Sequence, residues 1–249
     1  MGVYLKEFST HSEYDAYING SGAILPNVSI CTTEGDVHYN PYVDPCKQYD
    51  YVEIGGVKWA TKNIGACGIT DTGLYFQWGD ISGYTAAQCG SGEGQKYFGF
   101  EDYKWADGYG VSKYNRDDGK TVLGIEDDAA RANWGGQWRI PTWAEIQALG
   151  DAVDTVVVSN YNGTNVNGIL CTDKTDSSKK LFFPAAGFCH EGSMQFVGNS
   201  GFVWSSSIYS DSVFSAHDLY FDKDMGGADY WGSVDAREMG FTVRAVIDE

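Results

Sequence analysis

The sequence predicts an α+β fold with few helices, small antiparallel sheets and long irregular loops. The 249-residue chain is rich in glycine (32) and aromatic residues (15%) but has only 5 prolines. Short runs of β-branched and aromatic residues alternate with glycine and asparagine turns, and helical periodicity is confined to short segments. With 43% apolar residues, the chain can form one large domain, or one domain with a small companion.

Residues 1–48 are expected to form a small N-terminal connector module. A short helix and two short strands are predicted within it, over residues 8–18, 27–31 and 36–39. Pro45 marks the end of this segment, so a larger domain is expected over residues 49–249.

The larger domain begins with a predicted hairpin. Strands over residues 51–54 and 57–60 flank a two-glycine turn, and residues 74–78 read as a short apolar strand. Residues 79–122 have no sustained period, so this long segment needs aromatic side chains to hold it in place. The aromatic residues expected to do so are Tyr97, Phe98, Phe100, Tyr103 and Trp105.

Two helices are predicted in the middle of the chain. Residues 126–134 contain three alanines, which favour a short helix. The second helix follows Pro141, with Thr142 as its N-cap and Glu145 as the reciprocal partner of a capping box. Its expected buried stripe comprises Trp143, Ile146, Leu149 and Val153.

Six further strands are predicted beyond this helix. They cover residues 155–159, 169–172, 180–183, 202–205, 218–221 and 240–247. In the last strand Phe241, Val243 and Ala245 alternate with Thr242 and Arg244. This alternation predicts an antiparallel strand that is buried on one face only.

Charge and hydropathy exclude several classes of partner. The net charge of −17 and the pI near 4.4 argue against nucleic acid and anionic membrane. No segment approaches the roughly 20 apolar residues of a membrane span, so no membrane insertion is expected. No signal-peptide pattern is visible at the start, so either the natural start was trimmed or the protein leaves the cell another way, for instance inside a larger particle. An extracellular location, on a phage virion or a bacterial surface, is expected.

The cysteines predict neither a metal site nor a cofactor. Six cysteines occur at positions 31, 46, 67, 89, 171 and 189, none in a Cys-x-x-Cys pair, and the chain has only 4 histidines. The even number leaves three disulfides open. Buried free thiols are nevertheless preferred, because a domain of this length does not need disulfides.

A series of motifs resembles a known family. The motifs are GVKWATKNIG (56–65), YFQWG (75–79), DDAA (127–130), WGGQWRIPT (134–142), FPAAG (183–187), WSSS (204–207) and GFTVR (240–244). They occur in this order in the Fibrobacter succinogenes major paralogous domain and its Bacteroidetes relatives. The resemblance implies a C-type-lectin-like fold with two helices, small antiparallel sheets and a long loop region beside the C-terminal strands.

The C-terminal layout carries a narrower resemblance. WSSS, a mixed insert and the pattern Arg-x-x-Gly-Phe-x-Val-Arg (237–244) are similar to variable proteins of diversity-generating retroelements. In that family adenine-directed mutagenesis rewrites a C-terminal segment whose outward positions bind ligand. Residues 25–29 and 37–41 resemble a segment of tail proteins of gut Bacteroides phages. These resemblances imply receptor binding by a phage tail or cell-surface protein, with a protein or glycan ligand, and a fibre-tip role would favour a homotrimer.

The insert between the two framework motifs is the candidate binding surface. Its mixture of Tyr, Trp, Ser, Asp and Gly is typical of antibody paratopes. Leu219 and Phe221 alternate as an inward face, so Tyr220 and Asp222 are expected to point outward. The candidate ligand-binding residues are Tyr209, Asp211, Val213, Phe214, His217, Asp218, Tyr220, Asp222, Lys223, Met225, Asp229, Tyr230, Trp231, Ser233, Asp235 and Arg237.

Other functions of the charged residues are weaker interpretations. The acids of the insert lack EF-hand spacing and the sugar-binding motif of calcium-dependent lectins, so solvated charge is preferred to a calcium site. His217 is interpreted as a ligand contact or a surface residue. Arg139 and Arg244 are expected to be buried or half-buried and to hold loops by hydrogen bonds.

Two alternative functions remain open. The first is an undiversified adhesion or scaffold module of the same family. The second is an oxidase that resembles formylglycine-generating enzymes, which use paired cysteines on copper; Cys171 and Cys189 are the candidates here. No hydrolase, metalloprotease or phosphate-loop motif is present, so the sequence favours a binding protein over an enzyme.

Overall fold

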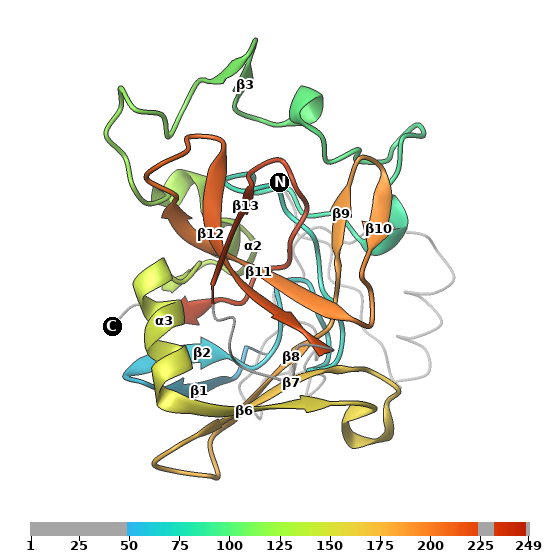
Figure 1. Ribbon diagram of the computed structural model, residues 1–249, viewed down its shortest axis with the longest axis vertical. Helices are drawn as coiled ribbons and strands as arrows, with labels where there is room; N and C mark the ends of the chain where they lie inside the picture. The colour runs from blue at the N-terminus through green and yellow to red at the C-terminus, as the bar shows by residue number, and fades with distance from the viewer. Residues whose placement is uncertain (1–48, 224–231, 248–249) are drawn as a thin grey trace, which may run out of the picture. The chain divides into compact units, whose positions relative to one another are not determined.

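The computed structural model describes residues 49–223 and 232–247. The chain divides into two units, Met1–Asp44 and Pro45–Glu249, and every described residue belongs to the second. The elements predicted within residues 1–48 lie outside the described residues. The described part is an α+β structure with two α-helices and several small antiparallel sheets (Figure 1).

The first and last strands of the described part share one sheet. Strands β1 (Tyr51–Ile54) and β2 (Val57–Ala60) form the predicted hairpin. Its turn residues Gly55 and Gly56 both have positive φ, +62° and +77°, which is why two glycines suit this turn. Strand β14 (Val246–Ile247) pairs with β2 and with β5 (Trp138–Arg139), giving the order β1-β2-β14-β5.

Two further sheets lie at opposite ends of the domain in Figure 1. Strands β6 (Val153–Val158), β7 (Gly168–Asp173) and β8 (Lys180–Pro184) form an antiparallel meander at the lower end. Strands β9 (Phe188–His190) and β10 (Ser193–Gln195) form a hairpin at the upper right. The strands predicted over residues 155–159, 169–172 and 180–183 match β6, β7 and β8 within two residues, whereas β9 and β10 were not predicted.

The central sheet separates two hydrophobic cores. It contains β11 (Ser200–Ile208), β12 (Ser215–Asp222) and β13 (Ser233–Ala236), in that order. Trp204 and Ala216 face one core, which also contains Trp78, Tyr114 and Phe241; we call it core A. Val203, Leu219 and Phe221 face the other, core B, which also contains Ile146 and Leu149. Strands β11 and β12 are therefore covered on both faces.

The second predicted helix begins at its predicted cap, whereas the first begins three residues later than predicted. Helix α3 (Trp143–Ala152) has the expected capping box: the Glu145 N–H donates to Thr142 Oγ1 at 3.3 Å, and the Thr142 N–H donates to the Glu145 carboxylate at 2.7 Å. Helix α2 (Ala129–Trp134) is shorter than predicted, because residues 125–127 form a 3₁₀ turn and Asp128 caps the helix by accepting from the Arg131 N–H at 2.9 Å.

Residues 79–122 are mostly irregular, as predicted. They contain 3₁₀ turns at Ala86–Gln88 and Phe100–Asp102 and the short strands β3 (Ala106–Asp107) and β4 (Gly110–Val111). Of the aromatic residues expected to hold this segment, Phe98 and Tyr103 are buried, whereas Tyr97, Phe100 and Trp105 are only partly buried. Tyr114, which the sequence analysis did not select, is fully buried.

The prediction of a half-buried last strand is wrong. Phe241, Thr242, Val243 and Arg244 are all at most 1% exposed, so both alternating sets are buried. The segment runs between the two cores and pairs only through single bridges, such as Phe76–Phe241, until β14 begins. The expected role of Arg244 is confirmed: its guanidinium donates to Asn63 Oδ1 and to the carbonyls of Ala60 and Phe182 at 2.9–3.1 Å.

The two framework tryptophans tie the C-terminal stretch to residues 75–79. Trp204 Nε1 donates to the Phe76 carbonyl and Trp78 Nε1 donates to the Ser205 carbonyl, both at 2.8 Å. Both side chains are 1% exposed. These reciprocal bonds explain why each motif needs its indole. None of the helices in the described ranges has the length and apolar character needed to cross a membrane.

Candidate functional site

The described candidate residues lie on the β11–β12 turn, along β12 and its C-terminal end, and on or directly after β13. Tyr209 to Phe214 form the turn between β11 and β12, His217 to Asp222 lie on β12, and Ser233 and Asp235 lie on β13. Lys223 directly follows β12, and its N–H donates to the Asn199 carbonyl at 3.0 Å. Met225, Asp229, Tyr230 and Trp231 lie outside the described residues.

Four partly exposed side chains form an aromatic patch, defined here as Trp143, Tyr209, His217 and Val234. The Trp143 and His217 rings stack with centroids 4.8 Å apart and an interplanar angle of 5°. Tyr209 meets His217 edge-on at 5.4 Å. Val234 is directly opposite His217 in the β12–β13 ladder and is 37% exposed. Elements distant in the sequence thus build one apolar surface.

The patch is attached to rigid structure. Trp143 is the first residue of α3, and its N–H donates to Ser207 Oγ of β11 at 3.0 Å. Partial burial lowers the pKa of His217 below its ordinary value, despite an opposing hydrogen bond with the Ser233 backbone. The imidazole is therefore neutral at pH 7 and adds an aromatic face rather than a charge.

The turn between β11 and β12 adds polar and apolar groups beside the patch. The Tyr209 hydroxyl donates to Asp211 Oδ2 at 3.1 Å, and this contact raises the pKa of Tyr209. Phe214 is 40% exposed, with its ring 6.0 Å from that of Phe100. The turn is closed by the Tyr209 N–H, which donates to the Ser215 carbonyl at 3.1 Å.

The prediction that Arg237 contacts ligand is wrong, because its side chain is fully buried. Its guanidinium lies 4.5 Å from the Trp78 ring centroid. It donates to the Tyr103 hydroxyl and to the carbonyls of Lys113, Tyr114 and Val213, at 2.6–3.1 Å. Arg237 therefore connects residues 103–114 to the turn that carries Tyr209 and Phe214.

The prediction that Asp218 faces a ligand is also wrong. The Asp218 side chain is 0% exposed, because this position of β12 faces core A together with Ala216. Neither of its carboxyl oxygens accepts a hydrogen bond from any residue that the structure describes. Its polar neighbour is the half-buried carboxyl group of Asp235 on β13.

The alternation predicted for the rest of β12 holds in part. Leu219 and Phe221 are buried in core B, as predicted. Tyr220, which was expected to point outward, is partly buried and packs against core A, with its ring 4.9 Å from that of Phe202. Asp222 is partly exposed and accepts from Ser200 Oγ at 2.6 Å. The strand has no fully exposed face because a core covers each side.

Sequence reasoning assigned Trp143 to the core and missed its place in the patch. The helical stripe of Ile146 and Leu149 is buried as expected, but Trp143 is only partly buried. No local signal could reveal this position, because the ring that stacks on Trp143 belongs to β12. Val234 was missed for the same reason, since its exposure depends on β13 being an edge strand.

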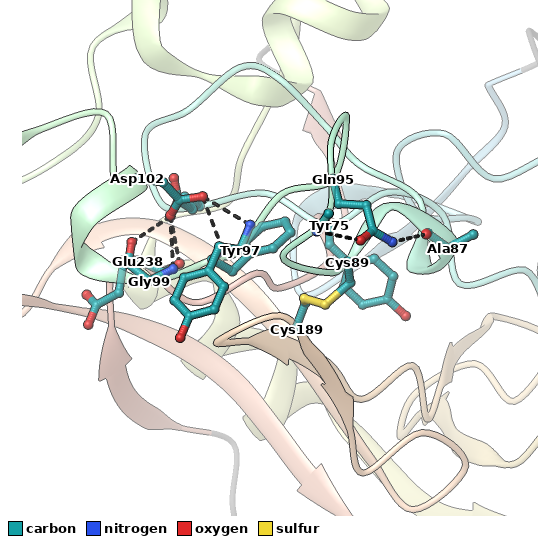
Figure 2. The surroundings of a disulfide bond; sticks show 12 residues. Tyr75, Ala87, Cys89, Gln95, Tyr97, Gly99, Asp102, Cys189 and Glu238 are labelled. Atoms are coloured by element: carbon teal, nitrogen blue, oxygen red, sulfur yellow. Dashed lines mark hydrogen bonds between the residues drawn. A yellow bond between two sulfur atoms is a disulfide. The ribbon is translucent and has the colours of Figure 1, made fainter.

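A disulfide fixes the long irregular segment. Cys89 is bonded to Cys189 of β9, and Figure 2 shows this bond beside Tyr75. Nearby, the Asp102 carboxylate accepts from the Tyr97 and Gly99 N–H groups at 3.1 and 2.9 Å (Figure 2). The Asp102 contacts close a turn within the segment, and the disulfide together with Gln77 Nε2, which donates to Asp102 Oδ1 at 3.1 Å, attaches the segment to the rest of the domain.

The preference for free thiols is confirmed for one cysteine and wrong for three. Cys171 is a free, fully buried thiol, and burial raises its pKa. Cys67, like Cys89 and Cys189, is disulfide-bonded. Cys189 is disulfide-bonded to Cys89 and Cys171 is a free thiol. These two cysteines therefore do not form the pair that a formylglycine-generating site requires.

Over the described residues, no three or more His, Cys, Asp and Glu side chains converge as ligands of a metal ion. Comparison with protein-family models, with curated protein sequences and with solved structures gives no match to this chain.

Proposed function

We propose that this chain is a non-enzymatic binding protein with a C-type-lectin-like fold, and that its ligand contacts the aromatic patch and the adjoining turn. The observation that carries the proposal is the partly exposed stack of Trp143 and His217, flanked by Tyr209. Stacked rings at a surface offer a large contact area with little side-chain entropy left to lose.

The supports of the patch favour binding over a purely structural function. β12, which carries His217, is covered by a core on both faces, and Arg237 fixes the turn that follows Tyr209. A rigid mounting reduces the entropy lost when a ligand binds. Ser, Asp and Tyr groups beside the rings add adaptable hydrogen bonds, as paratopes do.

The architecture is consistent with the proposed lectin-like fold. The described part has two helices and small antiparallel sheets. Its long irregular segment bonds to the C-terminal part of the chain: the Ile208 N–H of β11 donates to the Thr121 carbonyl at 2.9 Å, and Arg237, directly after β13, donates to the Lys113 carbonyl at 3.1 Å. This is the relation between loop region and C-terminal strands that the family resemblance implies.

The proposed mode of use is diversification of the ligand-contacting positions, on a protein displayed by a phage tail or cell surface. The candidate positions that are exposed or partly exposed are Tyr209, Asp211, Val213, Phe214, His217, Tyr220, Asp222, Lys223, Ser233 and Asp235. The disulfide-bonded cysteines favour an oxidising, extracellular location. A cell-surface protein or glycan is the expected class of ligand.

Sequencing of the gene and its relatives tests the diversification. Codons for the partly exposed positions should differ between relatives and match adenines in a nearby template repeat, with a reverse transcriptase gene close by. Codons for Arg237 and Leu219 should stay constant, because both side chains are buried. A C-terminal segment that is constant across strains would instead support an undiversified adhesion module.

Binding to a glycan array and to intact gut bacterial cells tests the patch directly. His217→Ala and Trp143→Ala should each lower the affinity for whichever probe the wild-type protein recognises by at least about tenfold. Tyr109→Ala is the matched control, because this side chain is fully exposed on the segment between β3 and β4, away from α3 (Figure 1). Equal binding by all variants would reject the patch as the site.

A further inference from the structure

Asp218 is the one fully buried carboxyl group of the described residues whose two oxygens both lack a hydrogen-bond donor. We propose that Asp218 and Asp235 share a single proton that holds β13 against β12, and that loss of this proton loosens β13 and the binding face beside it. The existence of the shared proton does not depend on the proposed function. Only the effect of the proton on ligand binding rests on the proposed function.

The strand register brings the two carboxyl groups together. In the β12–β13 ladder Asp218 is opposite Ser233, and Ala216 is opposite Asp235. Directly opposite residues share a face, and alternate residues of a strand do too, so Asp218 and Asp235 are diagonal neighbours on the core A face. Ser233, the residue opposite Asp218, donates a hydrogen bond from its Oγ to Asp235 Oδ2 at 3.1 Å.

Burial decides which group carries the proton. Two ionised carboxylates on diagonal neighbours repel each other, and removing an isolated charge from water is unfavourable. Burial, followed by the charge of Asp235, raises the pKa of Asp218 well above its usual range. Burial also raises the pKa of Asp235, but its hydrogen bonds with Ser233 and Asp218 oppose the rise. Protonated Asp218 therefore donates to the Asp235 carboxylate.

A bound cation is the competing way to neutralise the pair. Calcium prefers six to eight oxygen ligands, usually with several carboxylates. No third acidic, histidine or cysteine side chain joins the two aspartates in the described part of the chain. A proton needs only the two carboxyl groups, so the geometry favours it.

The surrounding titratable groups do not supply a compensating charge. On the core A side, Tyr114 has its pKa raised to about 12 by burial, and its hydroxyl donates to Asp127 at 2.7 Å. The Arg237 guanidinium, at the end of β13, is bonded to carbonyls and the Tyr103 hydroxyl. Tyr220 shares the face of Asp218, and neutral His217 lies on the opposite face.

β13 is suited to respond to the pair. It has four residues and lies at the edge of its sheet, where β12 is its only partner among the described strands. Both carboxyl groups lie within the four-residue register that joins the strands. Val234 of the aromatic patch is the residue next to Asp235, so repulsion between the two carboxylates would act directly beside the patch.

The sign of the pH dependence follows from the raised pKa of Asp218. The protonated form is favoured in the folded state, so its contribution is complete below the ordinary aspartate pKa of about 4. The contribution is lost as pH rises from that value through the raised pKa of the folded state. One proton changes the opening equilibrium by at most about tenfold per pH unit.

The test compares the wild-type chain with Asp218→Asn, whose amide can donate to Asp235 at every pH. Hydrogen-exchange protection of the β13 amides, corrected for intrinsic rates, is measured between pH 4.5 and pH 8.5. Wild-type protection should fall with rising pH by up to about tenfold per unit. Protection in Asp218→Asn should be nearly constant. Asp154→Asn, on an exposed position of β6, is the control and should keep the wild-type slope.

Three results separate the alternatives. A wild-type slope in Asp218→Asn would overturn the proposal, as would calcium-dependent protection of the wild type that this variant lacks. Asp235→Asn is the second variant in case the first does not fold, and it should also flatten the slope. Because the readout requires no ligand, failure of the patch variants to change binding would reject the proposed function without affecting the shared proton.

Discussion

The turn between β11 and β12 and the strand β12 that follows it have similar compositions but opposite environments. Both contain aromatic, serine and aspartate residues. In the turn, Asp211 is exposed and Phe214 is 40% exposed, whereas in the strand Asp218 is 0% and Phe221 is 5% exposed. A chemically mixed sequence therefore does not by itself identify a binding surface, because the strand uses the same residue types to join two cores.

The largest loss of stability is expected from removal of the Cys89–Cys189 disulfide. Replacing both Cys89 and Cys189 by serine opens a loop with a sequence separation of 100 residues. The loop-closure model gives a loss of about 4–5 kcal/mol in the free energy of unfolding. Urea denaturation checks this value, and Cys171→Ser provides a comparison that leaves the disulfide intact. A loss below about 1 kcal/mol would show that the other contacts of residues 79–122 suffice.

Arg237→Ala should have the next largest effect, because it removes a buried guanidinium from three carbonyls and the Tyr103 hydroxyl. A loss of about 3–4 kcal/mol is expected, since the abandoned acceptors remain buried. The exposed Arg116 is the control, and its alanine variant should change stability by less than about 0.5 kcal/mol. Equal losses of stability in the two variants would contradict the structural role assigned to Arg237.

His217→Ala should separate binding from stability. It removes one ring of the stack with Trp143 and should lower the free energy of unfolding by about 1 kcal/mol. Affinity for the recognised probe should fall at least about tenfold, the loss typical of a central aromatic contact. His217→Phe, which preserves a flat ring, should retain stability. Unchanged affinity in His217→Ala would show that the stack of His217 and Trp143 is structural and does not contact the ligand.

Asp211→Asn should have the smallest effect on folding. The carboxylate is exposed and its partner is the Tyr209 hydroxyl of the same turn. The midpoint of thermal unfolding should move by less than about 2 °C. A larger shift would mean that the turn contributes to the stability of the fold. The turn and β12 would then differ less in their structural roles than the exposure of their side chains indicates.

Asp211 and Asp218 differ in burial, since Asp211 is exposed and Asp218 is 0% exposed, and the sequence did not predict this difference. Both were predicted as ligand contacts from the composition of the insert. Only the cross-strand register reveals that Asp218 faces a core and meets Asp235. The same limit applies to Trp143 and His217, because their stacking joins a helix to a strand of the central sheet.

The sequence by itself determined the features that depend on a few neighbouring residues. These are the two-glycine turn of the β1–β2 hairpin, the Thr142–Glu145 capping box of α3, and the inward alternation of Leu219 and Phe221. Only the tertiary structure decided which strands are covered twice, which cysteines pair, and which polar residues are buried. The physical reason is that local turns and caps form within a few residues, whereas burial of a second face and the meeting of two carboxyl groups require segments from distant parts of the chain.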